Sequence, residues 1–236
     1  MMLLLKLLLA HVLGDFVLQP AKWVAHKLER KIKSGYLYLH LLVHLLAMLT
    51  VLGFDFTFLP GILLIALAHY LIDLSKLYLT GRADSKLLFV LDQLAHLLVI
   101  FFVAQYYTPL AGISFNFGEK EVFLILTLLC VTSVSSVIIR VLMSAWKMAD
   151  DSSSLNNAGM YIGILERLFV FVFIVMGQWQ VIGFLIAAKS VFRFSDLTRA
   201  KDRKLTEYIL IGTLLSFALA VGFSLIYLAL KEKVLY

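Results

Sequence analysis

Long apolar runs separated by short polar connections make up most of the chain. Crossing a bilayer takes a helix of about 20 apolar residues, and the runs lack the strict alternation of a membrane β-strand. The pattern predicts eight spans, of which the first and the seventh are short, at residues 2–19, 36–53, 58–79, 87–107, 121–143, 160–177, 180–194 and 206–230. The expected fold class is all-α, a polytopic membrane bundle of about eight transmembrane helices.

Residues 20–34, between the first two runs, combine basic and apolar side chains at helical spacing. One face would hold Trp23, Val24, Leu28 and Ile32. Pro20 suits the first turn of a helix. We expect an amphipathic helix that lies on the membrane surface. A solvated basic loop is the alternative, because positive charge alone also suits the inner membrane surface.

Basic residues gather in alternate connections, at residues 20–35, 76–86, 140–159 and 193–205. The positive-inside rule places such connections in the cytoplasm. We therefore expect a multi-pass protein of the cell inner membrane, with both termini outside the cytoplasm and anionic lipids of the inner leaflet as partners. The same distribution speaks against nucleic-acid binding.

Hydrophobic residues form 62% of the chain, against about half in a soluble domain, so no large soluble domain is expected. The one polar, turn-rich stretch is 149–158, which suggests a seam between a five-helix part at 1–148 and a three-helix part at 149–236. The single cysteine, Cys130, excludes an internal disulfide. The chain also contains no phosphate-binding glycine motif.

Four of the predicted spans carry two ionisable side chains four residues apart. The pairs are His11 and Asp15, His40 and His44, His69 and Asp73, and Asp92 and His96. Spacing of i,i+4 places both members of a pair on one helix face. Because neighbouring spans run in opposite directions, all four pairs fall at a similar depth, in the cytoplasmic half of the bilayer.

An ionisable residue near the centre of a membrane helix costs about 2.5–3.5 kcal/mol, so these eight groups need compensation. Imidazole and carboxylate are ligands for zinc, manganese and non-haem iron. We predict that all eight belong to a site for one or two divalent ions, with Zn favoured over Mn or Fe. Asp15, Asp73 and Asp92 would bridge metals or activate water. The alternatives are hydrogen bonds between helices or a proton relay.

A second polar set lies in the C-terminal part. Its basic members, expected to bind a substrate phosphate, are Arg140, Arg167, Lys189 and Arg193. The alternative is structural: Glu166 or Glu207 would form an ion pair with Arg167 or Lys189, because buried charges in membranes normally pair.

The stretch "AHVLGDFVLQPAKWVAHK" resembles an uncharacterised family of bacterial inner-membrane proteins, a domain of unknown function. The resemblance covers roughly the first 105 residues. It rests on an H-x-x-x-D-F-x-x-Q helix and a following tryptophan, here His11, Asp15, Phe16, Gln19 and Trp23. It implies a class of protein and no activity. More loosely, the chain is similar to membrane-bound metal-dependent hydrolases, although their His-Arg and His-Ser pairs are missing here.

These observations favour a metal-dependent hydrolase that acts on a lipid or lipid-linked phosphate or ester at the cytoplasmic leaflet. One alternative is a divalent-metal or proton-coupled transporter, although no inverted repeat is evident. Another is a membrane assembly protein fastened by a structural metal.

Overall fold

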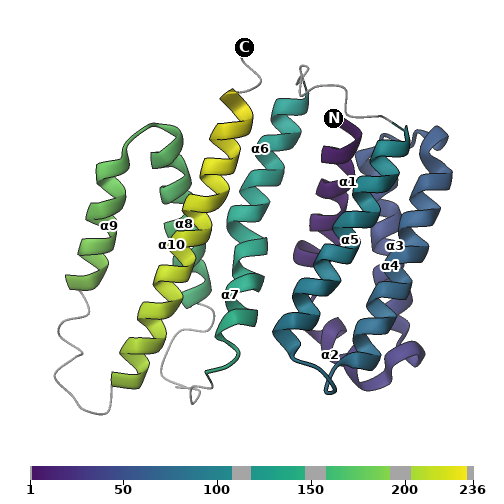
Figure 1. Cartoon of the computed structure of the whole chain (residues 1–236), viewed down its shortest axis with the longest axis horizontal. Helices are drawn as coiled ribbons and strands as arrows, with labels where there is room; N and C mark the ends of the chain where they lie inside the picture. The colour runs from purple at the N-terminus through teal and green to yellow at the C-terminus, as the bar shows by residue number, and fades with distance from the viewer. Residues whose placement is uncertain (1, 108–117, 147–157, 192–202, 233–236) are drawn as a thin grey trace. The chain divides into compact units, whose positions relative to one another are not determined.

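The computed structural model describes residues 2–107, 118–146, 158–191 and 203–232, and within these ranges the chain is helical, with no β-strand (Figure 1). The expected all-α class is therefore confirmed. The chain divides into two compact units, Met1–Leu126 and Thr127–Tyr236, called unit 1 and unit 2 below. The expected seam at 149–158 falls almost wholly outside the described residues.

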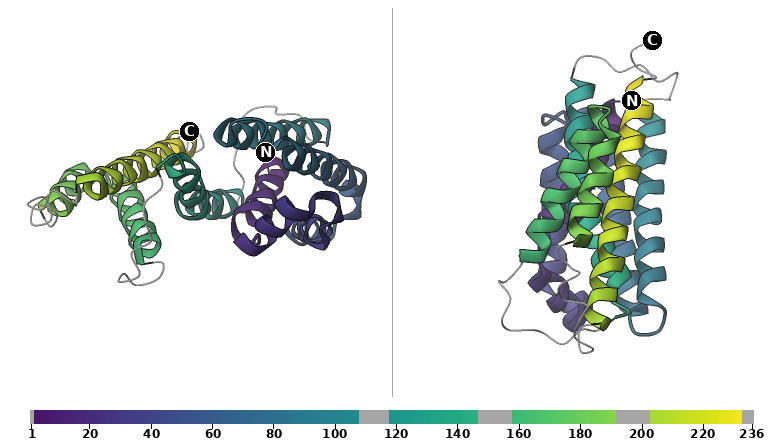
Figure 2. Two further views of the ribbon diagram at one scale, coloured as in Figure 1. Left: turned by 90° about the horizontal axis from the view of Figure 1, so that it is seen from below. Right: turned by 90° about the vertical axis from the view of Figure 1, so that its left-hand side faces the viewer.

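Unit 1 contains a ring of four apolar helices. These are α1 (Met2–Val12), α3 (Gly35–Val51), α4 (Leu59–Leu79) and α5 (Ser85–Tyr107). α1 packs on α3 and α5, and α4 packs on the same two helices (Figure 2). The core of the ring includes Leu7, Met48, Ile62, Ile65 and Ile100. Leucines on the outer faces are about half exposed, among them Leu63, Leu67, Leu94 and Leu98. Helices that are apolar on both faces suit a lipid surrounding.

α1 ends in a π-helical turn, η1 (Leu13–Val17), which contains Asp15. The turn is closed by the Leu18 amide, which donates to the Leu13 carbonyl at 2.8 Å. Such turns occur mostly as single insertions in α-helices, often at functional sites. After a sharp bend of 82° the chain enters α2 (Ala21–Arg30) and the short 3₁₀ turn η2 (Lys31–Lys33). The helix expected at 20–34 is therefore present; its position on a membrane surface stays a prediction.

Short connections complete unit 1. The 3₁₀ turn η3 (Phe56–Phe58) leads into α4. Asp84 precedes α5, and its Oδ1 accepts hydrogen bonds from the backbone amides of Lys86 and Leu87, at 2.8 and 3.0 Å. These bonds hold the pKa of the Asp84 carboxyl below its ordinary value, with the Leu87 amide as the main cause. They also satisfy amides that the first turn of α5 leaves free.

Unit 2 is also helical. Its elements, with α6 crossing the boundary between the units, are α6 (Glu119–Leu129), the π-helical turn η4 (Cys130–Val134), α7 (Ser135–Met143), α8 (Ala158–Val175), α9 (Trp179–Val191) and α10 (Arg203–Glu232). A core of Val170, Ile174, Ile182, Phe217 and Ala220 joins α8, α9 and α10.

Five helical segments of the described chain are long and apolar enough to cross a membrane. They are Phe56–Leu79, Ser85–Tyr107, Glu119–Met143, Ala158–Val175 and Lys204–Lys231. The bent pair Met2–Val17 and Ala21–Lys33 raises the number to six if it forms one span. The predicted count of eight is not supported, because α3 has only 17 residues and the described part of α9 has 13. At 1.5 Å per residue these helices reach about 26 and 20 Å, short of a hydrocarbon core of about 30 Å.

Candidate metal centre

The eight ionisable side chains of the four predicted pairs converge inside unit 1. Each ring helix contributes one pair, because i,i+4 spacing puts both members on the face that points into the ring. The pairs are His11 and Asp15 from α1 and η1, His40 and His44 from α3, His69 and Asp73 from α4, and Asp92 and His96 from α5. No more than 10% of any of these side chains is exposed. We call these eight residues the His/Asp centre.

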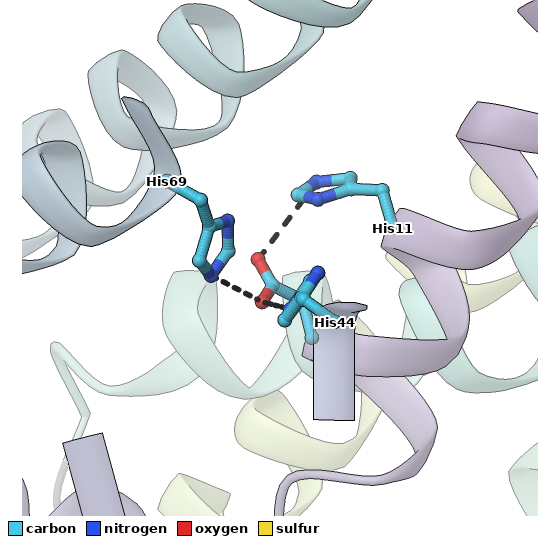
Figure 3. A group of neighbouring side chains, drawn as sticks. His11, His44 and His69 are labelled. Atoms are coloured by element: carbon cyan, nitrogen blue, oxygen red, sulfur yellow. Dashed lines mark hydrogen bonds and ion pairs between the residues drawn. The ribbon is translucent and has the colours of Figure 1, made fainter. Parts of the chain in front are cut away.

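The carboxylate of Asp15 lies at the middle of this centre. Its Oδ1 is 3.0 Å from His44 Nε2, 3.1 Å from His40 Nε2 and 3.7 Å from His69 Nε2. Its Oδ2 is 3.8 Å from His11 Nε2. Figure 3 shows His11, His44 and His69 turned toward one another from different helices. One carboxylate oxygen is thus shared by imidazole nitrogens from two further ring helices.

These distances suit the ligands of a single small cation. Around a tetrahedral zinc ion with bonds of about 2.0–2.1 Å, neighbouring ligand atoms lie about 3.3 Å apart. The Nε2 atoms of His40 and His69 are 3.1 Å apart, and the contacts of Asp15 Oδ1 bracket the same value. Two facing imidazole nitrogens can share only one hydrogen, whereas a cation satisfies both lone pairs.

Several buried polar atoms of the centre have no hydrogen-bond partner among the described residues. They are both ring nitrogens of His96, Nδ1 of His40 and Oδ1 of Asp92. His96 Nδ1 and Asp92 Oδ1 are 3.9 Å apart, too far for a hydrogen bond. A buried polar atom left unsatisfied costs about 1–3 kcal/mol, so this side of the centre has capacity for a ligand.

Two lysines that the sequence analysis did not assign to the site neutralise two of its carboxylates. Lys27 Nζ is 2.7 Å from Asp73 Oδ2, and Lys76 Nζ is 2.6 Å from Asp92 Oδ2. The Lys27 side chain is 5% exposed and that of Lys76 is 33% exposed.

Lys27 was not predicted because it lies on the basic face of the expected amphipathic helix, where a lysine needs no partner in the protein. Val24, Leu28 and Ile32, the expected apolar face, are 37–41% exposed. Lys27 instead points into unit 1, one turn beyond Trp23, which stacks on Tyr36. The spacing of Trp23 and Lys27 (i,i+4) was the available signal.

Gln93 and Gly14 also shape the centre, and neither was predicted. The Gln93 amide nitrogen donates to Asp15 Oδ2 at 3.2 Å and to Asp92 Oδ2 at 3.0 Å, and its Oε1 is 3.3 Å from His11 Nε2. A Cβ added to Gly14 would overlap the imidazole ring of His44. Glycine at this position therefore allows His44 to approach the π-helical turn.

A cavity of about 10 Å³ adjoins the centre. Its polar wall consists of His11, His44, His69 and His96. Apolar residues such as Met48 and Ile65 close the remainder. About 10–15 Å³ on this measure accommodates one water molecule, so the space matches a water or a small ion.

The basic residues expected to bind phosphate lie outside unit 1. Arg167 is buried and donates to the Val131 and Thr132 carbonyls and to the hydroxyls of Ser136 and Ser216. Lys189 forms an ion pair with Glu166 at 2.6 Å, which fits the structural alternative. Arg140 is exposed, and Arg193 lies outside the described residues. The structure thus shows protein partners for Arg167 and Lys189.

The described chain thus combines apolar helices long enough to cross a membrane with a buried cluster of His, Asp and Lys side chains. The chain belongs to the family described as "Protein of unknown function (DUF3307)", which matches residues 3–124. The matched region contains the whole His/Asp centre with Lys27, Lys76 and Gln93. No curated protein and no solved structure matches the chain.

Proposed function

We propose that unit 1 binds a divalent transition-metal ion, zinc in the first place, and uses it to hydrolyse an ester or phosphoester of a lipid or lipid-linked substrate. One observation carries the proposal: Asp15 Oδ1 and three imidazole Nε2 atoms meet beside a water-sized cavity. Mn and Fe accept the same donor types and stay alternatives.

The hydrogen bonds of Gln93 favour a particular ligand set. Carboxylates of Asp15 and Asp92 can only accept, so the Gln93 NH₂ group faces them and its Oε1 faces His11. His11 Nε2 must then carry a hydrogen and donate to that oxygen, which leaves it no lone pair for a metal. We therefore assign Asp15, His40, His44 and His69 as ligands, with His11 orienting Gln93.

The cavity and His96 supply the remaining parts of a hydrolytic site. A zinc or manganese ion makes bound water a nucleophile at neutral pH. His96 lines the cavity and has both ring nitrogens unpartnered among the described residues, so it can accept a proton from water. The water oxygen then bonds to the phosphorus or carbonyl carbon, the bond to the leaving oxygen breaks, and the proton passes from His96 to that oxygen.

Charge at one end of unit 1 supports an anionic, lipid-linked substrate. α2, η2 and the connection between α4 and α5 carry exposed basic residues, which are Lys22, Arg30, Lys33 and Arg82. The exposed apolar residues Val24 and Leu28 lie on α2, and the exposed Ile32 lies on η2. This combination is typical of segments that bind anionic lipid surfaces. Arg140, Arg167, Lys189 and Arg193 have no part in the proposal.

The proposal is tested on detergent-purified protein loaded with Zn²⁺ or Mn²⁺, with bis(p-nitrophenyl) phosphate and phosphatidylglycerol vesicles as probes. We expect hydrolysis that a chelator abolishes and added metal restores. His96→Phe should retain the metal and lose about 10²–10⁴-fold in rate. His26→Phe, which changes the one histidine outside the centre, is the control and should keep the rate.

Metal-loaded protein that cleaves neither probe, or full activity in His96→Phe, would contradict the proposal. Accumulation of Zn²⁺ inside proteoliposomes without hydrolysis would support the transporter instead.

A further inference from the structure

The charges of the His/Asp centre limit how many metal ions it can hold, and this inference rests on the proposed function. The centre contains three carboxylates, and two of them, Asp73 and Asp92, form ion pairs with Lys27 and Lys76. With neutral imidazoles the net charge is one negative, which one divalent ion changes to one positive. A second divalent ion would leave three uncompensated positive charges in apolar surroundings, where unpaired charge is costly.

The lysines occupy the carboxylates of a second potential site. Donor atoms of Asp73, Asp92 and His96 lie within 4.8 Å of one another. Lys27 binds Asp73 and Lys76 binds Asp92, each through one oxygen. His96 is 2% exposed and Asp92 is 5% exposed, and Asp92 Oδ1 and both nitrogens of His96 have no partner among the described residues. The group therefore combines free donor atoms with two carboxylate oxygens that the lysines occupy.

We infer that the centre holds one metal ion, at Asp15, and that the ammonium groups of Lys27 and Lys76 take the place of a second ion at Asp73, Asp92 and His96. Without the two lysines, three carboxylates and two divalent ions have a net charge of one positive. The native centre has the same net charge when it holds one divalent ion. The second site is thus latent, and the lysines determine the stoichiometry.

The test counts metal ions per chain after equilibration with excess Zn²⁺ and removal of unbound metal. Lys27→Met/Lys76→Met should bind two ions where the native chain binds one. The matched control is Lys22→Met/Lys33→Met, which removes two exposed lysines of the same segment and should bind one. Asp92→Asn, added to the first double variant, should return it to one.

Two ions on the native chain, or one on a folded Lys27→Met/Lys76→Met variant, would overturn the inference. No metal on the native chain would overturn the proposed function itself, so the two failures are distinguishable. Because loss of the buried Lys27 can prevent folding, Lys76→Met is also measured alone. Lys76→Met should bind a second ion more weakly, at higher Zn²⁺, whereas Lys33→Met should bind one ion and no second. Equal stoichiometry of these two single variants would also overturn the inference.

Discussion

Arg167 of unit 2 and the His/Asp centre of unit 1 are both polar groups buried among apolar helices, but their partners differ. Arg167 is 3% exposed, and all three of its guanidinium nitrogens donate to carbonyl or hydroxyl oxygens. In the His/Asp centre, nitrogen and oxygen acceptors face each other, and four buried atoms have no partner among the described residues.

The surroundings of Arg167 explain why it needs no ligand. Two of its acceptors, the carbonyls of Val131 and Thr132, lie in the π-helical turn η4, and Ser216 belongs to α10. The side chain therefore connects α8 with η4 and α10 through hydrogen bonds. These bonds replace the ones that water would form with a solvated guanidinium group. The comparison indicates that a satisfied buried charge serves the fold, whereas a crowded and unsatisfied one indicates a missing ligand.

The largest effect in this comparison is expected for Arg167→Met. The change leaves two carbonyls and two hydroxyls without their donor, and we expect the free energy of unfolding of unit 2 to fall by about 2–4 kcal/mol. Metal content should not change. Thermal unfolding in detergent with metal analysis measures both quantities, and Arg140→Met, at an exposed position, is the control. Loss of metal from folded Arg167→Met protein would break the distinction between the units.

A smaller effect on unit 1 is expected for Gly14→Ala. The added methyl group would overlap the His44 ring, so His44 must move away from Asp15. We expect metal affinity to fall by about 10–100-fold, as it does when residues that orient a metal ligand are changed. Competition with a fluorescent zinc chelator measures the affinity. Gly35→Ala, where a Cβ would meet nothing within 4 Å, should bind as the native chain does; equal affinities of the two variants would exclude His44 as a ligand.

The smallest effect is expected for Gln93→Leu. This change removes the amide that links Asp15, Asp92 and His11, and outer partners of ligands contribute about tenfold or more to metal affinity. His11 also regains a free nitrogen, so ¹⁵N NMR of its ring should show a changed tautomer. An unchanged His11 spectrum would refute the assignment of His11 as a donor to Gln93.

The same contrast explains what the sequence could reveal. The i,i+4 pairs on four apolar runs are local features, so helix geometry alone indicated that each pair shares a face. Lys27 reaches Asp73 only because of the 82° bend after η1, and Gln93 and Gly14 matter only through contacts between helices. Contacts between helices do not follow from a local pattern, and the i,i+4 spacing of Trp23 and Lys27 gave no partner for the lysine.

The predicted number of eight membrane spans was not supported for a related reason. Hydropathy marks apolar runs, whereas the end of α3 depends on the turn after Val51, which limits this helix to 17 residues. The partners of Arg167 likewise depend on the carbonyls of η4 and on the packing of α10, which the pattern of charges did not reveal.

X-ray absorption at the zinc edge of the zinc-loaded, detergent-purified chain tests most directly whether Asp15, His40, His44 and His69 bind the metal. We predict nitrogen and oxygen ligands at about 2.0–2.1 Å, scattering from several imidazole rings, and loss of the bound zinc in Asp15→Ala. A native chain without zinc, a first shell without imidazole, or sulfur at about 2.3 Å would contradict the account.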